Sequence, residues 1–393
     1  LTTRAQKSTL RRLTTIPSPS TDFSSNDYLS LSTSPHLRAA YLALLTNTPA
    51  PAFSLGSSGS RLLDGNSEHT EALETSIAAF HRAPAGLLFN SGFEANVGVF
   101  ATLPQRGDVV VFDELVHASA HDGMRLSRAG RRVPFAHNCV ASLASVLDAL
   151  IREDERVRNG TRNVFVAVEA VYSMDGDVAP LEQMVGVVEG LLKGNGHFVV
   201  DEAHATGLVG ERGRGLVCEL GLEERVFARV HTFGKAMGCA GAIVLCAPLT
   251  REYLVNYART LIYTTAMAFP SLASIRVVYD FMSAGGTEPL LTHLTHLTHH
   301  LHTLLLPLCP PGPSSSIRPL LALPPFPPRT PILPLLTPHP RSLAAHCQAA
   351  GYVVRAIVAP TVPKGRERVR VCLHAGNTVG EVEGLVRAVE GWL

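Results

Sequence analysis

The stretch that decides the fold is Phe198-Val199-Val200-Asp201-Glu202-Ala203-His204-Ala205-Thr206-Gly207. Three consecutive apolar residues lead to an aspartate, and a histidine follows three positions later. Short apolar runs without polar alternation are typical of strands buried on both faces, which occur in parallel sheets covered by helices. The stretch therefore predicts an α/β fold with Asp201 and His204 at the carboxyl edge of a sheet, where such folds bind ligands.

Five further runs have the same character and alternate with helical patterns. They span residues 86–89, 109–113, 164–169, 226–232 and 242–246. Their length and β-branched content predict strands of one mainly parallel sheet. The polar residues that end the runs, or follow them, are then expected along the same sheet edge.

The chain has 393 residues, 46% of them hydrophobic, which is long enough for a large domain and a smaller one. We expect an N-terminal arm and short helix over 1–50, a large domain over 51–285 and a small α+β domain over 286–393. Within the small domain, proline crowding over 307–340 predicts an extended insertion of little regular structure. Beyond it we expect a helix at about 341–350, strands near 352–358 and 368–373, and a last helix from about 379.

Charge, hydropathy and cysteine spacing exclude several classes of protein. The net charge of +1 provides no field to attract nucleic acid, and no run of about 18 apolar residues supports a membrane span. The seven cysteines form no C-x-x-C pair, which indicates reduced thiols of an intracellular protein. We expect a cytoplasmic location; a peroxisomal one stays open, because the chain begins at Leu1 and its termini could be trimmed.

A histidine-rich stretch over 292–302 places His296 and His300 one helical turn apart, a spacing that could hold a metal. Leucines at positions 290, 294, 297, 301 and 304 form an apolar stripe, which leaves the histidines largely on the solvated side. No acidic third ligand is nearby. We interpret the stretch as a surface helix and expect no metal site.

The residues around Lys235 are suited to a cofactor. His231-Thr232-Phe233-Gly234-Lys235-Ala236-Met237-Gly238 places a lysine after a strand, and its small residues leave room for a flat ring beside the amine. A protonated pyridine nitrogen would supply the cation that a buried Asp201 needs, and His204 could then bond the ring's phenolic oxygen. Taken singly, each motif has an ordinary alternative: a solvated loop lysine, or an N-cap aspartate with a loop histidine.

Three other segments also follow apparent strand ends. Ser91-Gly92-Phe93 opens a helix whose free N–H groups could bind phosphate. His117 could stack on an aromatic cofactor, although a core-edge histidine is the plainer interpretation. Ser173-Met174-Asp175-Gly176-Asp177 brings hydroxyl and acidic groups to the same edge.

In this order, and over nearly the whole chain, the motifs resemble the α-oxoamine synthases, a family of fold-type I pyridoxal 5'-phosphate (PLP) enzymes. The resemblance is carried by FSSNDYL (23–29), GSSGSRL (56–62), SGFEAN (91–96), SMDGD (173–177), DEAHATG (201–207), TFGKAMG (232–238), LIYTT (261–265) and PTVP (360–363). It implies a large domain with a mainly parallel seven-stranded sheet, a smaller C-terminal α+β domain, PLP as cofactor, and a homodimer with active sites at its interface.

The resemblance also implies roles by position. Lys235 would hold PLP as a Schiff base and move the proton at the substrate α-carbon. Asp201 would pair with the ring nitrogen, His204 and Ser173 would orient the ring oxygen, and His117 would stack on the ring. Phosphate would be held by Gly92, Phe93 and Thr232, with Thr264 or Thr265 of a second subunit. Substrate would be bound by Arg370, Arg11, Thr361 and Asn26, with Arg370 on the amino-acid carboxylate and Arg11 on the distal carboxylate of the acyl chain.

Within the family, the chain most resembles members that condense L-alanine with pimeloyl-CoA in biotin biosynthesis. It departs from the family pattern at Val358, where arginine is frequent, at Ser30, where glycine is usual, and in the length of the proline-rich region. These departures bear on the acyl donor. Two alternatives stay open: an α-oxoamine synthase with a different amino acid or acyl-CoA, and a catalytically silent homologue that acts as an interaction partner.

Overall fold

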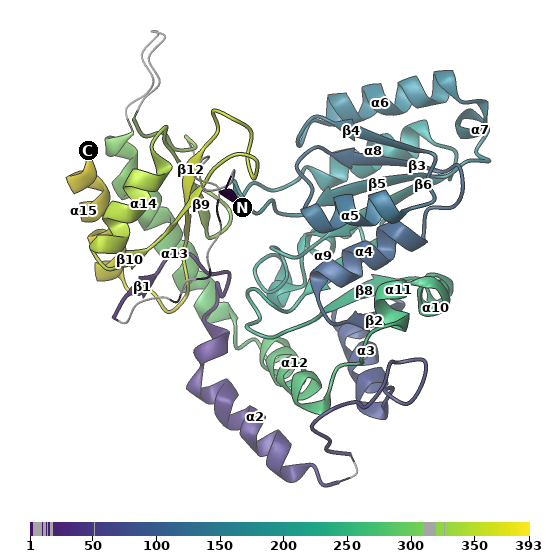
Figure 1. Cartoon of the computed structure of the whole chain (residues 1–393), viewed down its shortest axis with the longest axis horizontal. Helices are drawn as coiled ribbons and strands as arrows, with labels where there is room; N and C mark the ends of the chain where they lie inside the picture. Colours follow the sequence, from purple (N-terminus) through teal and green to yellow (C-terminus); the bar gives the residue numbers. More distant parts are fainter. Residues whose placement is uncertain are drawn as a thin grey trace.

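A computed structural model describes residues 1, 2, 10, 13, 15, 19–50, 52–309, 320–325 and 327–393. Figure 1 shows a large group of helices around one sheet and a smaller group around a second sheet. The chain passes from the large group to the small one between α12 (Phe269–Ser283) and α13 (Glu288–Leu305). The predicted combination of a large α/β domain and a smaller C-terminal α+β domain is confirmed.

The large sheet has seven strands in the order β2-β8-β7-β6-β5-β3-β4. Their bounds are β2 Ala85–Phe89, β3 Val109–Asp113, β4 Arg131–Phe135, β5 Val164–Glu169, β6 Gly196–Asp201, β7 Ala228–Thr232 and β8 Ala242–Cys246. Strand β8 runs antiparallel to both of its neighbours, and the other pairs are parallel. Strands β5, β7 and β8 are buried at every residue, so the expectation of a mainly parallel sheet with helices on both faces is confirmed.

Six of these strands coincide with the apolar runs of the sequence, with ends that differ by at most two residues. The seventh, β4, has the sequence RRVPF and contains no apolar run. It lies at the edge of the sheet, pairs with β3, and exposes Arg131 and Arg132. Edge strands accept charged residues and proline, because one side of their backbone needs no partner. A search for buried runs therefore cannot find β4.

Helices cover the large sheet and connect its strands. They are α3 (Glu68–Phe80), α4 (Gly92–Thr102), α5 (Ala118–Leu126), α6 (Val140–Glu153), α7 (Glu155–Arg158), α8 (Leu181–Leu191), α9 (Leu216–Glu219), α10 (Pro248–Tyr257), α11 (Arg259–Ile262) and α12, with the short 3₁₀ helix η2 (Glu211–Gly213). None of the helices in the described part of the chain is long and apolar enough to cross a membrane.

The small domain is built on a three-stranded antiparallel sheet in the order β11-β12-β9. Its elements are α13, η3 (Leu306–Leu308), β9 (Ile332–Leu336), α14 (Pro340–Ala349), β10 (Tyr352–Val353), β11 (Arg355–Ile357), β12 (Arg368–Cys372) and α15 (Val379–Trp392). The helices and strands predicted beyond residue 340 are confirmed to within a few residues.

Residues 307–340 contain more regular structure than expected, because they include strand β9 at the edge of the small sheet. This strand contains Pro334 and lies on the outer side of β12, a position in which a missing backbone N–H is tolerated. Residues 310–319 and 326, which belong to the same predicted insertion, lie outside the described residues.

The N-terminal segment, residues 21–30, packs against strands of the small C-terminal domain. Strand β1 (Thr21–Asp22) pairs with β10, and Cys372 N–H donates to the Phe23 carbonyl at 2.9 Å. A short helix then follows as α2 (Pro35–Asn47), capped by the Ser34 hydroxyl. Residues 21–30 therefore lie against the small domain, although they are more than 300 positions away from β10 in the chain.

The histidine-rich stretch forms α13, whose apolar stripe is buried at Leu294, Leu297 and Leu301. His296 is exposed, whereas His302 is buried and hydrogen-bonds the Pro324 carbonyl at 2.9 Å. No group of three potential metal ligands occurs among the described residues. All seven cysteines are free thiols, and five of them are buried.

Ser30 adopts a left-handed backbone conformation, with φ 53° and ψ 30°, before the 3₁₀ helix η1 (Leu31–Thr33). Glycine reaches this conformation without the steric cost that other residues meet. The Ser30 hydroxyl accepts a hydrogen bond from Gly376 N–H at 2.9 Å. That bond offsets part of the cost of having serine where the resembling family usually has glycine.

We expect Ser30→Ala to lower the free energy of unfolding by about 1 kcal/mol, because it keeps the left-handed backbone and loses the hydroxyl acceptor. Ser30→Gly should cost less, since glycine removes the steric term. Chemical unfolding of both variants beside the wild type measures the difference. A larger loss for glycine than for alanine would contradict this explanation.

Candidate active site

The carboxyl edge of the large sheet brings the predicted site residues together. Gly92 follows β2, His117 follows β3, Ser173 follows β5, Asp201 ends β6 and Lys235 follows β7. These five strands run in one direction, so the segments after them meet along one edge. The expected gathering of the five motifs is therefore observed.

Lys235 has the properties of a lysine that is prepared for covalent chemistry. Burial lowers the pKa of its amine and the positive charge of Arg370 adds to this, while Asp201 and Glu169 act in the opposite sense. No described residue hydrogen-bonds the amine. A desolvated amine without a fixed partner is available to a carbonyl carbon.

Asp201 is held by a buried amide that sequence reasoning did not single out. Asn96 Nδ2 donates to Asp201 Oδ2 at 2.7 Å and to Ser119 Oγ at 3.0 Å. Ser119 Oγ in turn lies 2.8 Å from His117 Nδ1. The carboxylate expected at the ring nitrogen and the histidine expected on the ring face thus belong to one hydrogen-bonded chain.

Glu169, at the end of β5, is a second buried carboxyl group beside Asp201. It accepts the His117 backbone N–H at 2.6 Å. Burial raises the pKa of Glu169 well above its usual value, and the negative charge of Asp201 adds to the effect. Burial also lowers the pKa of His117, which favours a neutral imidazole that can stack on an aromatic ring.

His204 follows β6 and meets the N-terminal segment. Its Nδ1 lies 2.8 Å from the hydroxyl of Tyr28, a fully buried residue. Burial and the positive charges of Lys235 and Arg370 keep the pKa of His204 well below its usual value. The imidazole is therefore neutral, and its Nε2 has no hydrogen-bond partner among the described residues.

Arg370, on β12, brings the small domain to the site. Its Nε donates to the Ser173 carbonyl at 2.6 Å, and its Nη2 donates to Asn26 Oδ1 and to the Tyr28 hydroxyl, each at 3.0 Å. The guanidinium is thereby fixed beside Lys235, whose pKa it lowers. Of the predicted substrate residues, Arg370 and Asn26 are in mutual contact.

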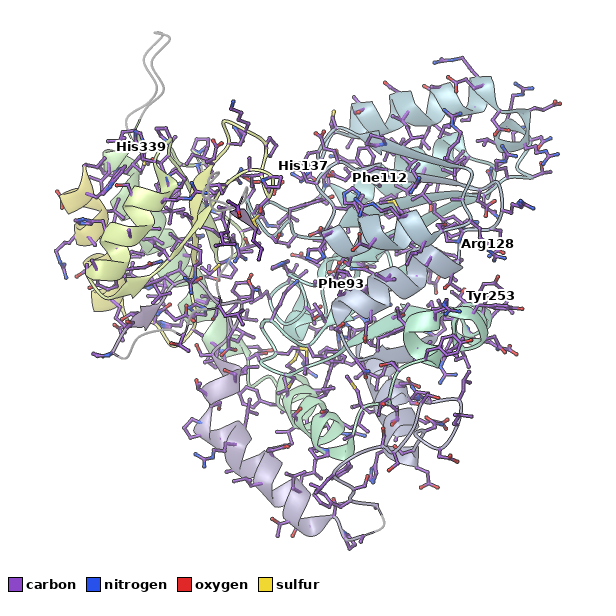
Figure 2. The ribbon with its side chains drawn as sticks, viewed as in Figure 1. Phe93, Phe112, Arg128, His137, Tyr253 and His339 are labelled. Carbon is purple, nitrogen blue, oxygen red and sulfur yellow. The ribbon has the colours of Figure 1, made fainter. Side chains whose placement is uncertain are left out.

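The start of α4 has the backbone features expected of an anion site. The Ser91 hydroxyl caps the helix by accepting Glu94 N–H at 3.1 Å, and no described residue accepts the N–H groups of Gly92 and Phe93. A Cβ on Gly92 would lie 3.2 Å from Thr232 Cβ, so the turn and β7 make close contact. Phe93 is 47% exposed at the start of the helix (Figure 2).

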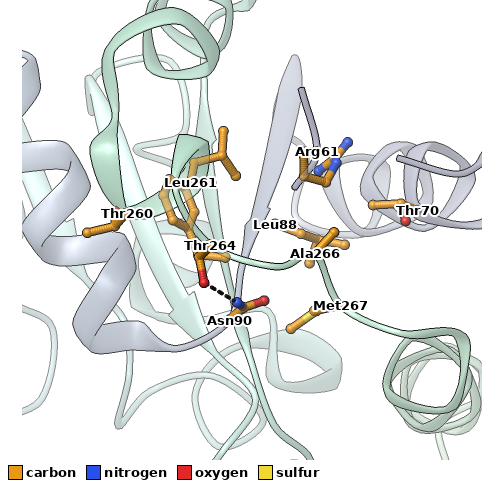
Figure 3. A pocket seen from close by; sticks show the side chains of 10 residues that line it. Arg61, Thr70, Leu88, Asn90, Thr260, Leu261, Thr264, Ala266 and Met267 are labelled. Carbon is orange, nitrogen blue, oxygen red and sulfur yellow. Dashed lines mark hydrogen bonds between the residues drawn. The ribbon is translucent and has the colours of Figure 1, made fainter. Parts of the chain in front are cut away.

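Thr264 and Thr265 lie next to this turn within the same chain. Asn90 Nδ2 donates to Thr264 Oγ1 at 3.2 Å (Figure 3). It also donates to the Thr265 carbonyl at 2.9 Å. The expectation that they reach the site of a second subunit stays a prediction. Thr361 is exposed after β11, where its N–H donates to the Val358 carbonyl at 3.0 Å. Arg11 lies outside the described residues.

The loop from Ser173 to Asp177 is fixed from both domains. Asp175 pairs with the buried Arg368 of β12, while His137 bridges two carboxylates, Asp113 at 2.9 Å and Asp177 at 2.8 Å. Figure 2 shows His137 on the side of the large domain that faces the small one. Burial opposes the charged form, but the hydrogen bonds to Asp113 and Asp177 raise the pKa of His137 to about 10.

The site fits PLP in three places. A desolvated lysine amine has no described partner, a carboxylate is fixed by a buried amide, and unpaired helical N–H groups lie beside Thr232. These groups match an aldehyde, a pyridine nitrogen and a phosphate, respectively. The residues that could hold PLP are therefore Lys235, Asp201, Gly92, Phe93 and Thr232, with His117 and His204 around the ring.

Comparisons with known proteins agree with this geometry. The model of the family "Aminotransferase class I and II" matches residues 18–389. The chain is 57% identical to the 8-amino-7-oxononanoate synthase of Emericella nidulans over 99% of this chain and 93% of the relative. It is 41% identical to the aminoacyl transferase sphA of Aspergillus fumigatus over 93% and 79%, respectively.

Solved structures show the same fold. The serine palmitoyltransferase of Sphingomonas wittichii has a TM-score of 0.82 at 27% identity, with 95% of this chain and 87% of that chain covered. A serine palmitoyltransferase variant of S. paucimobilis with bound PLP has a TM-score of 0.80 at 25% identity, with the same coverage.

We expect protonated His137 to stabilise the folded protein in a pH-dependent way. The contribution should be complete below about pH 6.5, the pKa of histidine in an unfolded chain, and should disappear as the pH rises toward about 10. His137→Gln should therefore cost about 2 kcal/mol of unfolding free energy at about pH 6 and almost nothing at about pH 10. Urea unfolding at both pH values measures this gap, and a gap independent of pH would contradict the assignment.

Proposed function

The chain belongs to the class I and II aminotransferase family of PLP-dependent enzymes, as an α-oxoamine synthase, and we propose that it condenses L-alanine with pimeloyl-CoA. The products would be 8-amino-7-oxononanoate, carbon dioxide and free CoA, a step of biotin biosynthesis. The observation that carries this proposal is the similarity to the Emericella nidulans synthase over almost the whole of both chains.

PLP, when bound, supplies a protonated ring that withdraws electrons from the α-carbon of an amino acid. Asp201 would keep the proton on the ring nitrogen, and the hydrogen bond from Asn96 Nδ2 limits the orientations of its carboxylate. Lys235 would take and return the proton at the α-carbon, because its lowered pKa leaves the amine able to accept one.

The amino-acid carboxylate would be held by Arg370, assisted by Asn26. The Nε and Nη2 of Arg370 are already used within the chain, and no described residue accepts from its Nη1. A carboxylate at Nη1 would therefore meet a guanidinium whose orientation is already fixed, which reduces the entropy lost on binding. Arg11 would meet the distal carboxylate of the pimeloyl chain, and Thr361 would line the pocket.

We also propose that the enzyme acts as a homodimer. Phe93, Thr264 and Thr265 belong to the predicted phosphate-binding residues and are at least partly exposed, which suits residues at a subunit interface. Tyr263, directly before the two threonines, is 71% exposed. Large exposed aromatic residues next to a binding site are typical of contact surfaces between proteins.

The second candidate is a related synthase with a different amino acid or acyl-CoA. The similarity to the Aspergillus fumigatus aminoacyl transferase favours it, as does Val358, which is half-buried just after β11. A catalytically silent homologue is disfavoured, because Lys235 and Asp201 are both present and lie in one electrostatic cluster.

We expect the purified enzyme to convert L-alanine and pimeloyl-CoA into a product with the mass of 8-amino-7-oxononanoate. Parallel reactions with glycine and serine, and with shorter and longer acyl-CoA thioesters, test the choice of substrates by mass spectrometry. Product formation with another pair alone would establish the second candidate. A colourless protein that forms no product with any pair would point to the silent homologue.

We expect Asp201→Ala to lower turnover by at least about 100-fold, because each pKa unit lost at the ring nitrogen is worth about 1.4 kcal/mol. The variant should still bind PLP, since Lys235 and the start of α4 are unchanged, and its visible absorption band reports this directly. Asp148→Ala, which removes an exposed carboxylate on α6, is the matched control. Near-normal turnover of Asp201→Ala would refute the role of the carboxylate.

A further inference from the structure

The hydroxyl group of Tyr28 occupies a junction between the two ends of the candidate site. It lies 2.8 Å from His204 Nδ1, 2.9 Å from Asn26 Oδ1 and 3.0 Å from Arg370 Nη2. His204 belongs to the large domain and Arg370 to the small one, whereas Tyr28 comes from the N-terminal segment. One buried oxygen atom therefore connects the histidine expected at the ring oxygen with the arginine expected at the substrate carboxylate.

The hydrogen bonds around the Tyr28 hydroxyl can be arranged in two ways, because the hydroxyl has only one proton. Arg370 can only donate, so the single proton of Tyr28 goes either to Asn26 Oδ1 or to His204 Nδ1. If it goes to Asn26, His204 must carry its own proton on Nδ1 and present a bare Nε2. If it goes to His204, the imidazole carries its proton on Nε2. Both arrangements contain the same number of protons, so they differ only in the tautomer of the neutral His204.

The tautomer of His204 determines whether its Nε2 can donate a hydrogen bond to the cofactor. Tyr28 is fully buried and its own carbonyl accepts Ala375 N–H at 2.7 Å, so the ring cannot turn toward water for other partners. The imidazole is kept neutral by burial and by the nearby positive charges of Lys235 and Arg370, which lower the pKa of His204. A neutral imidazole offers the cofactor either a donor or an acceptor at Nε2, and the hydrogen bond at Nδ1 decides which one it is.

We propose that Tyr28 is a positioning residue that sets the tautomer of His204 by donating a hydrogen bond to its Nδ1, in competition with Asn26 Oδ1. The inference rests on the proposed role of His204 at the ring oxygen. A negative ring oxygen on bound PLP would favour a proton on His204 Nε2, so the Tyr28 proton would be directed mainly to His204 Nδ1 and only in a minority of molecules to Asn26 Oδ1. His204 would then donate from Nε2 to the ring oxygen.

The test uses the holoenzyme without any substrate and follows the pH midpoint of the absorption change of bound PLP. Tyr28→Phe removes the hydrogen bond that the Tyr28 hydroxyl donates to His204 Nδ1 and so weakens the donor at Nε2, which leaves the negative ring oxygen less stabilised. The midpoint should rise by about half a unit to one unit, which corresponds to one hydrogen bond. Tyr253→Phe, a surface tyrosine that bonds Gln105 and Arg128, is the control and should leave the midpoint unchanged.

Asn26→Ala provides a shift of the opposite sign. It removes Asn26 Oδ1, the competing acceptor, and leaves Tyr28 in place. The Tyr28 hydroxyl then donates to His204 Nδ1 in every molecule, so the pH midpoint of the absorption change should fall. A loss of general packing would move the midpoints of Tyr28→Phe and Asn26→Ala in the same direction. Shifts of the same sign in both variants would therefore overturn the proposal, and melting temperatures show whether either variant is misfolded.

Arg370→Lys and Tyr28→Phe together form a double-mutant cycle. Lysine keeps the positive charge of Arg370 but loses the hydrogen bond from Nη2 to the Tyr28 hydroxyl. We expect Arg370→Lys to shift the midpoint in the wild-type background and to have no further effect once Tyr28 is phenylalanine. Additive shifts would overturn the proposal. No amino acid or acyl thioester enters these measurements, so an error in the proposed substrates would leave their outcome intact and would appear only in the product assay.

Discussion

The common direction of β2, β3, β5, β6 and β7 is the constraint on which the site depends. Parallel strands deliver their carboxyl ends to one edge, so five chain segments that are far apart in sequence meet without long connections. The antiparallel β8 lies between β2 and β7 and leaves the phosphate turn and the lysine loop on the same edge. A shift of register in any of these strands would displace one functional group from the others.

At the carboxyl edge of the large sheet, negative and positive groups each influence the charge of the others. Two carboxyl groups, Asp201 and Glu169, face two cations, Lys235 and Arg370, in a desolvated setting. Burial works against every charged form, so each group keeps or loses its charge according to its neighbours. The hydrogen bonds of Asn96 and Tyr28 add direction to this balance, because they fix where the carboxylate and the imidazole can point.

Much of the fold could be predicted from the sequence, because buried parallel strands leave continuous apolar runs. The strands β4 and β9 could not, since an edge strand carries arginine or proline without penalty. For the site, the sequence motifs indicated which reactive side chains to expect. Asn96 and Tyr28 lie inside motifs quoted from the sequence, but Asp201 and His204, which they hydrogen-bond, are over 100 positions away. Hydrogen bonds between distant residues leave no local pattern.

The docking of residues 21–30 against β10 and β12 determines when the site can fold during synthesis. The ribosome makes this segment before β10, the strand that β1 joins, and before β12, which carries the arginine that Tyr28 contacts. Closing so long a loop is slow compared with local folding. The nascent large domain can therefore form early, while a competent catalytic centre has to wait until β12 has also been synthesised.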